Sequence, residues 1–530
     1  MNKFIDDEIS LDDFSYDFEG KEKKDDRVAI IGVSIRTSSG NTEEFWEDIK
    51  NGCNLVSEFR NQRMKDIKEY NAVLGRKYKY ADGAFINDID KFDYKFFNMT
   101  PKEAQLMDPC YRLFLQNTIN AIEDAGYGNN RLDNTDTRIY VGYAGNIKDS
   151  YINMIWNTNE KDVSMSIVNN MTGMISGRLS HILNTHGTAQ IIDATCASSL
   201  IAVHEGCESI ISGKCSIAIV GSMRINLIPV ESETSRIGVE SKDYQTRTFD
   251  DKASGFGEGD GVVTLILKSF EKAIRDKDNI HAVIKASAVS QGGESMGLTV
   301  TNPSALKDTI SDVILHADQK IDNIGMYELH GTATNLGDPI EMQGMSDALR
   351  LFTQNKAFCA IGSVKSNIGH LYEASGIIGL VKAILSLEHK TIPPTINLTE
   401  PNREILFENS PFYINTKARY WKCENGKRAA LVNSLGLNGA NCCVLVEEYD
   451  NEYLAYYVSN NNKYSKPLIL SFGMTEDGGI YNQAILNHEL TVILPINILG
   501  DKEKIINYCD SCYDDYIESE ELSGERVILQ

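Results

Sequence analysis

Strand-like apolar stretches alternate with amphipathic helical stretches along most of this chain, and no other feature constrains its fold as strongly. The regular pattern begins at Arg27 and ends at Glu448. Alternation of this kind buries the strands in a sheet and covers the sheet with helices. The sequence therefore predicts an α/β protein in which layers of helices pack against sheets.

Most of the expected elements have clear bounds. Thr42 is a plausible N-cap for the first helix, and Gly126 stops the second. A faint similarity between 28–32 and 282–286 suggests two related halves. The expected strands are 28–32, 191–192, 216–220, 262–267, 281–290, 325–329, 430–435 and 444–447, and the expected helices are 42–51, 108–126, 197–212 and 376–387.

The two ends of the chain carry most of its negative charge. Residues 1–26 have a net charge of −6 and residues 449–530 a net charge of −9, out of −23 for the whole chain. We expect 1–26 to be a disordered acidic segment. Strand signals at Leu468–Leu470 and Thr491–Leu494 suggest that 449–530 is a linker or a small appended unit. Solubility is the simplest role for both acidic ends.

Charge, hydropathy and cysteine usage exclude several classes of protein. An acidic chain is a poor nucleic-acid ligand, because such binding depends on Lys and Arg neutralising phosphates. The longest apolar runs are far too short to span a bilayer, and the polar N-terminus is not a secretory signal. The odd number of cysteines, 11, indicates free thiols in a reducing compartment, the cytoplasm. The isolated Cys509-Asp-Ser-Cys512 lacks a second ligand pair and is weak support for a metal or redox site.

One cysteine occupies a position that favours reactivity. In Ile191-Ile-Asp-Ala-Thr-Cys196-Ala-Ser-Ser-Leu200, a strand expected to be buried runs into a tight turn, and a helix starts at Cys196. The partial positive charge of a helix N-terminus can lower a thiol pKa from about 8.5 to roughly 7 or below. Backbone N–H groups at the same turn can hold an oxyanion. A small buried cysteine that only fills space is an equally good interpretation of this segment alone.

Two of the nine histidines lie in glycine-containing turns after strand-like stretches. They are His330, in Glu328-Leu-His330-Gly-Thr-Ala-Thr334, and His370, in Lys365-Ser-Asn-Ile-Gly-His370. Turns of this type bring side chains close to a ligand. Each histidine taken by itself could equally be a hydrogen-bonded structural residue.

Taken together, these motifs resemble the β-ketoacyl synthase family, and in particular the ketosynthases of polyketide synthases. The three central motifs are Asp193-Ala-Thr-Cys196-Ala-Ser-Ser, His330-Gly-Thr-Ala-Thr and Lys365-Ser-Asn-Ile-Gly-His370. The resemblance covers about 27–448, with the motifs in the family's order. Supporting segments are 108–113, 255–259, 337–341 and 393–397.

The resemblance implies a thiolase fold, with two similar halves in an α-β-α-β-α arrangement and here a small C-terminal appendage. The N-terminal half, 27–280, would carry the nucleophile, and the C-terminal half, 281–448, both histidines. Cys196 would take an acyl group from an acyl carrier protein. His330 and His370 would then stabilise the enolate that forms as a malonyl-type thioester loses CO₂, and the carbanion would attack acyl-Cys196.

The family pattern also assigns supporting roles. Lys365 and Glu341 match a buried ion pair, and Thr332 and Thr334 match pantetheine-binding residues. The oxyanion hole would be the backbone N–H groups of Cys196 and Leu437. No metal or tightly bound cofactor is implied, and the substrates are carried on phosphopantetheine. The usual assembly is a homodimer.

Departures from the family concern the glycine-rich loop Ser434-Leu-Gly436-Leu-Asn438-Gly. Leu437 replaces the bulky aromatic ring that often gates the acyl pocket, so the sequence predicts an acyl pocket that is roomier or differently shaped. Cys442 and Cys443 follow Asn441, where the family has alanine and a histidine that is not catalytic.

Three alternatives remain. The chain could be a non-condensing ketosynthase that only transfers acyl groups, a structural carrier-docking protein with a vestigial site, or a thiolase that uses coenzyme A. The presence of Cys196, His330 and His370 disfavours the first, and the altered glycine-rich loop is the only feature that favours the second. The third is disfavoured because Cys442 or Cys443 only loosely resembles the second cysteine that such thiolases use as a base. No acyltransferase motif is present, so a separate acyltransferase would load malonyl groups. Arg60, Arg63 and Lys65 are a candidate basic patch for an acidic carrier.

Overall fold

The computed structural model describes residues 25–449, except 60–62, 76–78, 129, 146–149, 232–237, 296, 298 and 424–425, and the backbone of three strands beyond 449. Arg60 and the Cys509–Cys512 motif lie outside the described residues, as do residues 1–24. The chain divides into two compact units, Met1–Tyr449 and Asp450–Gln530. No helix in the described part is long and apolar enough to cross a membrane.

The first unit is built on one sheet of eleven strands, in the order β14-β12-β11-β16-β17-β10-β1-β9-β6-β4-β5. Each expected strand of this unit is present, with shifted ends. Sequence patterns had not indicated β4, β12 and β14. The strands are β1 (Val28–Thr37), β4 (Arg138–Gly142), β5 (Ala189–Ile192), β6 (Ile217–Arg224), β9 (Gly261–Ser269), β10 (Ala282–Gln291), β11 (Ile324–Glu328), β12 (Cys359–Gly362), β14 (Phe412–Ile414), β16 (Ala429–Leu435) and β17 (Ala440–Glu448).

Strand pairing repeats between the two halves of the sheet. In the first half, β1 is antiparallel to β9, β9 to β6, and β6 is parallel to β4, which is parallel to β5. In the second half β10, β17, β16, β11 and β12 follow the same sequence of directions. The pairings also shift register at matching places, between Ile30 and Gly32 and between Ile284 and Ala286. The antiparallel pair β1–β10 joins the halves.

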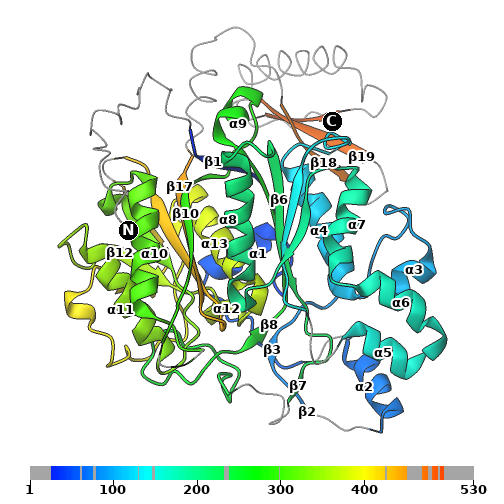
Figure 1. Cartoon of the computed structure of the whole chain (residues 1–530), viewed down its shortest axis with the longest axis horizontal. Helices are drawn as coiled ribbons and strands as arrows, with labels where there is room; N and C mark the ends of the chain where they lie inside the picture. The colour runs from blue at the N-terminus through cyan, green and yellow to red at the C-terminus, as the bar shows by residue number, and fades with distance from the viewer. Residues whose placement is uncertain are drawn as a thin grey trace, which may run out of the picture. The chain divides into compact units, whose positions relative to one another are not determined.

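Helices form three layers around the two half-sheets, and each interface is a separate apolar core. Helices α8 and α13 lie in the middle and share one core with both halves. Helices α4 and α7 cover the outer face of the first half, and α10 and α11 that of the second. Figure 1 shows α10 and α11 on the left, α4 and α7 on the right, and α8 and α13 between them. The arrangement is an α-β-α-β-α stack.

The α-helices are α1 (Thr42–Lys50), α2 (Arg63–Val73), α3 (Pro101–Gln105), α4 (Pro109–Asp124), α5 (Tyr151–Thr158), α6 (Val163–Asn170), α7 (Gly173–Leu183), α8 (Ser198–Ile211), α9 (Phe270–Asp276), α10 (Pro303–Ala317), α11 (Gly337–Arg350), α12 (Lys365–Ile368) and α13 (Ser375–Glu388). One-turn segments are η2 (Glu160–Asp162), η3 (Thr195–Ala197), η4 (Ile321–Asn323), η5 (Tyr372–Ala374) and η6 (Phe407–Asn409). Short strand pairs are β2 (Lys79–Tyr80) with β7 (Val230–Glu231), β3 (Gly83–Ala84) with β8 (Glu258–Gly259), and β13 (Thr391–Ile392) with β15 (Arg419–Tyr420).

Two local expectations are wrong. The N-cap of α1 is Asn41, whose side chain accepts hydrogen bonds from the N–H groups of Glu43 and Glu44, and not Thr42. The Thr42 hydroxyl instead accepts from the N–H of Ile35. Strand β5 was expected to be buried, but it lies at the edge of the sheet and its residues are half-buried or exposed.

The second unit contains a three-stranded antiparallel sheet of β18 (Leu468–Met474), β19 (Ile480–Leu486) and β20 (Leu490–Leu494). The sequence signals at Leu468–Leu470 and Thr491–Leu494 fall on its outer strands. The central strand, β19, had not been indicated.

Candidate active site

Cys196 lies on a sharp turn between a strand and a helix, as the sequence predicts. Strand β5 ends at Ile192, η3 contains Cys196, and α8 begins at Ser198. Thr195 has a φ of 53°, in the left-handed region that a β-branched residue rarely adopts. The Ser198 hydroxyl donates to the Thr195 carbonyl oxygen at 2.6 Å and accepts from the Ala194 N–H at 2.8 Å. These bonds hold the strained turn.

The glycine-rich loop after β16 packs against this turn. The Ser434 hydroxyl donates to the carbonyl oxygen of Cys196 at 2.9 Å. A Cβ atom on Gly436 would lie 2.6 Å from the Ala194 carbonyl oxygen and 3.0 Å from Thr195 Oγ1, so only glycine fits. Leu437, next in the chain, is 42% exposed. Leu437 therefore follows a residue packed on the nucleophile turn and has an accessible side chain, as a gate of the acyl pocket would need.

The two motif histidines come together from segments that are far apart in the chain, one after a strand and the other after a short helix. His330 follows β11 and His370 follows α12, yet their ring centroids are 5.5 Å apart and their planes are nearly perpendicular. Both are buried. The Glu341 carboxylate on α11 holds the first turn by accepting from the N–H groups of His330 at 2.8 Å and Gly331 at 2.9 Å. Gly369, with a φ of 70°, turns the chain into His370.

Neighbouring side chains determine the orientation of the His370 ring. The Phe256 ring is nearly perpendicular to the His370 ring, with ring centroids 4.6 Å apart, and the Tyr372 ring stacks on the His370 ring with centroids 5.1 Å apart. Nδ1 of His370 lies 2.6 Å from the Ser375 hydroxyl, which also accepts from the N–H of Leu371 at 3.1 Å. A serine hydroxyl can accept two hydrogen bonds and donate one, so this contact fits either tautomer of the ring. Donation from Ser375 to Nδ1 places the ring proton on Nε2.

Burial controls the protonation states of the site. Desolvation, followed by the charge of Lys365, lowers the pKa of His330 and of His370 well below the usual range, so both rings are neutral at physiological pH. Desolvation and then the charge of Glu373 raise the pKa of Cys196 to about 11. The helix N-terminus had suggested a lower pKa for this thiol, whereas desolvation by burial, the largest cause, raises it.

The expected direct ion pair between Lys365 and Glu341 is also absent from the described contacts. Glu341 uses both oxygens on backbone N–H groups. Lys365 is buried, and desolvation lowers its pKa. The charges of Glu328 and Glu341 act in the opposite direction but are outweighed. The close pair is Lys382 with Glu328, at 2.6 Å.

Thr332 and Thr334 lie in the turn between His330 and α11. Both are half-buried, and Ala333 between them has a φ of 56°. The Thr334 hydroxyl accepts from the N–H of Gly337 at 3.1 Å, at the start of α11, and its own proton is free to donate to a ligand. Their role in binding pantetheine stays a prediction.

One residue of the suggested basic patch, Arg63, does not lie on the surface. The side chain of Arg63 is 5% exposed and pairs with Asp260 at 2.7 Å. It also donates to the carbonyl oxygen of Ile86. Arg63 therefore stabilises the interior and cannot receive a carrier protein, whereas Lys65 is exposed.

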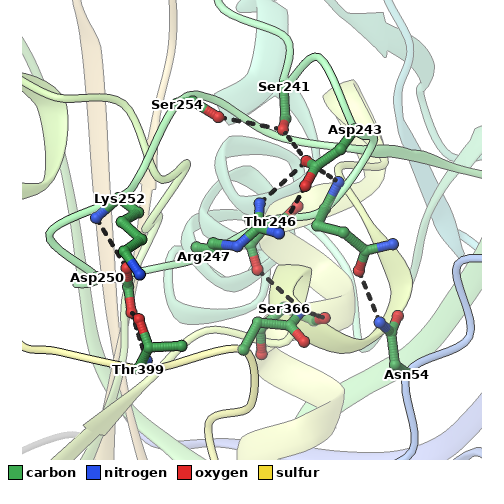
Figure 2. Close-up of polar contacts among 12 residues, drawn as sticks. Asn54, Ser241, Asp243, Thr246, Arg247, Asp250, Lys252, Ser254, Ser366 and Thr399 are labelled. Carbon is green, nitrogen blue, oxygen red and sulfur yellow. Dashed lines mark hydrogen bonds and ion pairs between the residues drawn. The ribbon is translucent and has the colours of Figure 1, made fainter.

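A polar loop that sequence reasoning missed supports the His330 turn. Figure 2 shows its network, in which Arg247 donates two hydrogen bonds to Asp243 and Asp250 accepts from Thr399. From the same loop, the Thr248 hydroxyl donates to the Gly331 carbonyl oxygen at 2.8 Å. The Phe249 N–H donates to Asp338 at 2.9 Å. The density of Ser, Thr and Asp in 241–250 was the available signal.

Comparison with known proteins agrees with this geometry. Residues 25–273 match the β-ketoacyl synthase N-terminal domain, and residues 281–399 match its C-terminal domain. Polyketide synthases PksL and PksM of Bacillus subtilis are each 36% identical over 438 residues, covering 82% and 80% of this chain. The chain spans about a tenth of the length of these relatives, 10% in each case.

Solved ketosynthase structures are similar over most of the chain. A ketosynthase from module 6 of the Bacillus subtilis bacillaene synthase has 33% identity and a TM-score of 0.72, covering 83% of this chain and 79% of that one. Ketosynthase twelve from the Bacillus amyloliquefaciens bacillaene synthase has 31% identity and the same TM-score, with 80% and 76% covered.

The layered fold and these matches define a protein of the thiolase superfamily, with the thiolase fold that the sequence predicted. Within it, the chain belongs to the β-ketoacyl synthase family, as a ketosynthase of the polyketide synthase type. Ketosynthases of this type are acyltransferase enzymes.

Proposed function

We propose that this chain catalyses decarboxylative Claisen condensation, with Cys196 as the acyl-carrying nucleophile. The observation that carries the proposal is the pair of buried histidines, His330 and His370, whose ring centroids are 5.5 Å apart and which desolvation keeps neutral. Two fixed neutral donors suit an oxygen that becomes negative during reaction. The strained turn at Cys196 presents the thiol at the start of α8.

Acyl transfer comes first. The sulfur of Cys196 attacks the thioester carbonyl of an acyl carrier protein, the bond from carbonyl to pantetheine sulfur breaks, and the carrier thiol takes the proton from Cys196. The N–H groups of Cys196 and Leu437 would hold the transient oxyanion. Such donors act without reorganisation, because the backbone is already in place.

Condensation follows with a malonyl-type carrier thioester. The bond between its carboxylate carbon and α-carbon breaks and releases CO₂. The electron pair passes into an enolate, whose oxygen accepts hydrogen bonds from His330 and His370. The α-carbon then bonds to the acyl carbonyl carbon, the bond from that carbon to the sulfur of Cys196 breaks, and the thiolate takes a proton from solvent. The product is a β-ketoacyl thioester on the carrier.

Further parts of the proposal concern binding and partners. Thr332 and Thr334 would bind the phosphopantetheine arm through their hydroxyls, and a separate acyltransferase would supply malonyl groups. A tightly bound cofactor is not required by these steps. Lys365 and Glu341 would support the site through buried charge and through the backbone of the His330 turn.

A homodimer is the proposed assembly. In the described sheet, β5 is an edge strand that pairs with β4 alone, so its outer N–H and C=O groups are available to a second copy. Exposed apolar side chains lie nearby in sequence on and after α6, namely Met165, Ile167, Val168 and Met171. The nine cysteines in the described residues are all free, which fits a cytoplasmic location.

A reconstituted condensation assay tests the proposal. A malonyl-loaded carrier and an acyl donor are supplied, and CO₂ release and the β-keto product are followed by mass. Wild type should condense, Cys196→Ala should fail to acylate, and His370→Ala should acylate but decarboxylate poorly. Full condensation by Cys196→Ala would show the proposed nucleophile to be wrong.

A further inference from the structure

An arginine and a glutamate near the nucleophile have no role in the proposed mechanism. Arg224 ends β6, and Glu373 lies in η5, three residues after His370. Segment η5 contacts both β6 and η3, which carries Cys196. The side chains of Arg224 and Glu373 are only 16% and 2% exposed. After desolvation, Glu373 is the next cause that raises the pKa of Cys196, while Arg224 lowers it, so both charges act on the sulfur.

Arg224 and Glu373 do not form a close hydrogen-bonded pair. Nη1 of Arg224 and Oε2 of Glu373 are 3.8 Å apart, which is too long for a hydrogen bond. Oε1 of Glu373 and Nε of Arg224 are buried without a hydrogen-bond partner. The guanidinium does donate to Asn226 Oδ1 at 3.2 Å and lies over the Tyr372 ring, 4.5 Å from its centroid.

Another buried pair in this protein shows what a saturated arrangement looks like. Arg428 lies just before β16, at the end of that strand away from Gly436. It donates to Glu448 at 2.6 Å and to the Trp421 carbonyl oxygen at 2.6 Å. The second oxygen of Glu448 accepts from the Arg428 N–H. Arg428 and Glu448 therefore need no further partner, whereas Arg224 and Glu373 have unused hydrogen-bonding capacity and charges that act on the Cys196 sulfur.

We propose that Arg224 and Glu373 form a polar subsite of the acyl pocket, which selects acyl chains bearing a hydroxyl group close to the thioester. This inference rests on the proposed acylation of Cys196. A hydroxyl both donates and accepts, so its proton can go to Glu373 Oε1 while its oxygen accepts from the Arg224 guanidinium. A saturated chain of equal length would leave both groups unpaired in a buried site.

Acylation by matched thioesters tests the subsite. The N-acetylcysteamine thioesters of butyrate and of each 3-hydroxybutyrate enantiomer are compared by the rate of mass addition at Cys196. Wild type should react roughly 10-fold faster with one hydroxy enantiomer than with butyrate, because a buried polar site rejects an analogue lacking its partner. Since all three react with one thiol, their rate ratio is independent of its pKa.

Variants locate the preference. Arg224→Gln and Glu373→Gln should bring the ratio close to one while butyryl transfer persists. Arg428→Gln, which breaks a buried pair away from the site, should keep the ratio. Equal rates in wild type, or a preference for butyrate, would overturn the subsite.

Binding to Cys196→Ala, measured by calorimetry with the same thioesters, separates the subsite from the chemistry. Tighter binding of one hydroxybutyryl thioester supports the subsite, and equal binding overturns it. If that preference is present but no thioester acylates wild-type Cys196, the proposed function fails while the subsite stands. The comparisons made with wild type and with Cys196→Ala stay valid even if Arg224→Gln or Glu373→Gln fails to fold.

Discussion

Glu328 and Lys382 form an ion pair in the protein interior, with Oε2 and Nζ 2.6 Å apart and side chains 2% and 1% exposed. Oε1 of Glu328 accepts from the N–H of Val364 at 2.6 Å. Glu328 ends β11, two residues before His330, and Val364 is six residues before His370. One carboxylate therefore connects α13 to the chain segments that lead into both histidine turns.

Removing one member of this pair should destabilise the fold strongly. Lys382→Met leaves a buried carboxylate without its charge partner, and we expect a loss of roughly 3–5 kcal/mol in the free energy of unfolding. Urea denaturation measures it. Lys50→Met, which breaks the exposed pair with Glu47, should leave the free energy of unfolding almost unchanged. A Lys382→Met protein as stable as wild type would contradict the importance of the pair.

Ser375 should act as a positioning residue for His370. Without the serine hydroxyl, Nδ1 of His370 loses the hydrogen bond that holds the ring in place, and we expect decarboxylation to slow about 10-fold, the equivalent of one hydrogen bond. Ser375→Ala should leave the acylation rate of Cys196 nearly unchanged, and Ser375→Thr should restore decarboxylation. Equal losses in both steps would indicate a general structural defect instead.

Alkylation of Cys196 should depend steeply on pH. With a pKa of about 11, roughly 0.1% of the thiol is ionised at pH 8, and the iodoacetamide rate should rise about tenfold per unit up to pH 10. Glu373→Gln removes a charge that raises the pKa and should speed alkylation at pH 8, whereas Arg224→Gln should slow it. Peptide mass mapping assigns the modified cysteine. A plateau near pH 8 would mean that the thiol is far more acidic.

His281 should make the protein less stable at high pH. Its ring nitrogens lie 2.9 Å from Asp124, at the end of α4, and 2.6 Å from Glu388, at the end of α13. Burial opposes the charged ring, but hydrogen bonds to both carboxylates outweigh it and raise the pKa to about 10.

A raised histidine pKa stabilises the fold fully below its unfolded value of about 6.5, and this contribution disappears as the pH rises through 10. Between pH 7 and 9.5, wild type should lose about 2–3 kcal/mol more unfolding free energy than His281→Gln. Urea titrations at the two pH values measure the difference. Parallel losses would show that His281 is not charged at pH 7.

Leu437→Phe should narrow the range of acyl chains that Cys196 accepts. Leu437 follows Gly436, which packs against the nucleophile turn, and a phenyl ring is larger and has fewer rotamers than leucine. Acylation rates for straight chains of increasing length should fall earlier in Leu437→Phe than in wild type. An unchanged profile would argue against the gate.

Much of the fold could be predicted from the sequence because its signals are local. The periodicity of Asp108–Gly126 predicted α4, and the similarity of 28–32 to 282–286 foreshadowed two halves with matching strand pairing. The short strands β4 and β12 lacked such a signal, and the edge position of β5 depends on sheet order, which no local pattern encodes.

The site divides in the same way. Cys196 at a strand-to-helix turn and two histidines after strands could be identified from residue types and turn chemistry. Lys382 was not recognised as the partner of Glu328, nor Arg224 as the neighbour of Glu373, because these residues are 54 and 149 positions apart and meet only through packing.

The sequence by itself determined the family, the α/β class of the fold, and the residues at the reactive turns. These properties depend on backbone preferences and on motifs within a few residues of each other. Only the tertiary structure decided which charges pair, that the histidines are neutral, and that burial raises the pKa of Cys196. Ionisation and pairing depend on desolvation and on distances between side chains from different layers, and these exist only after the layers have packed.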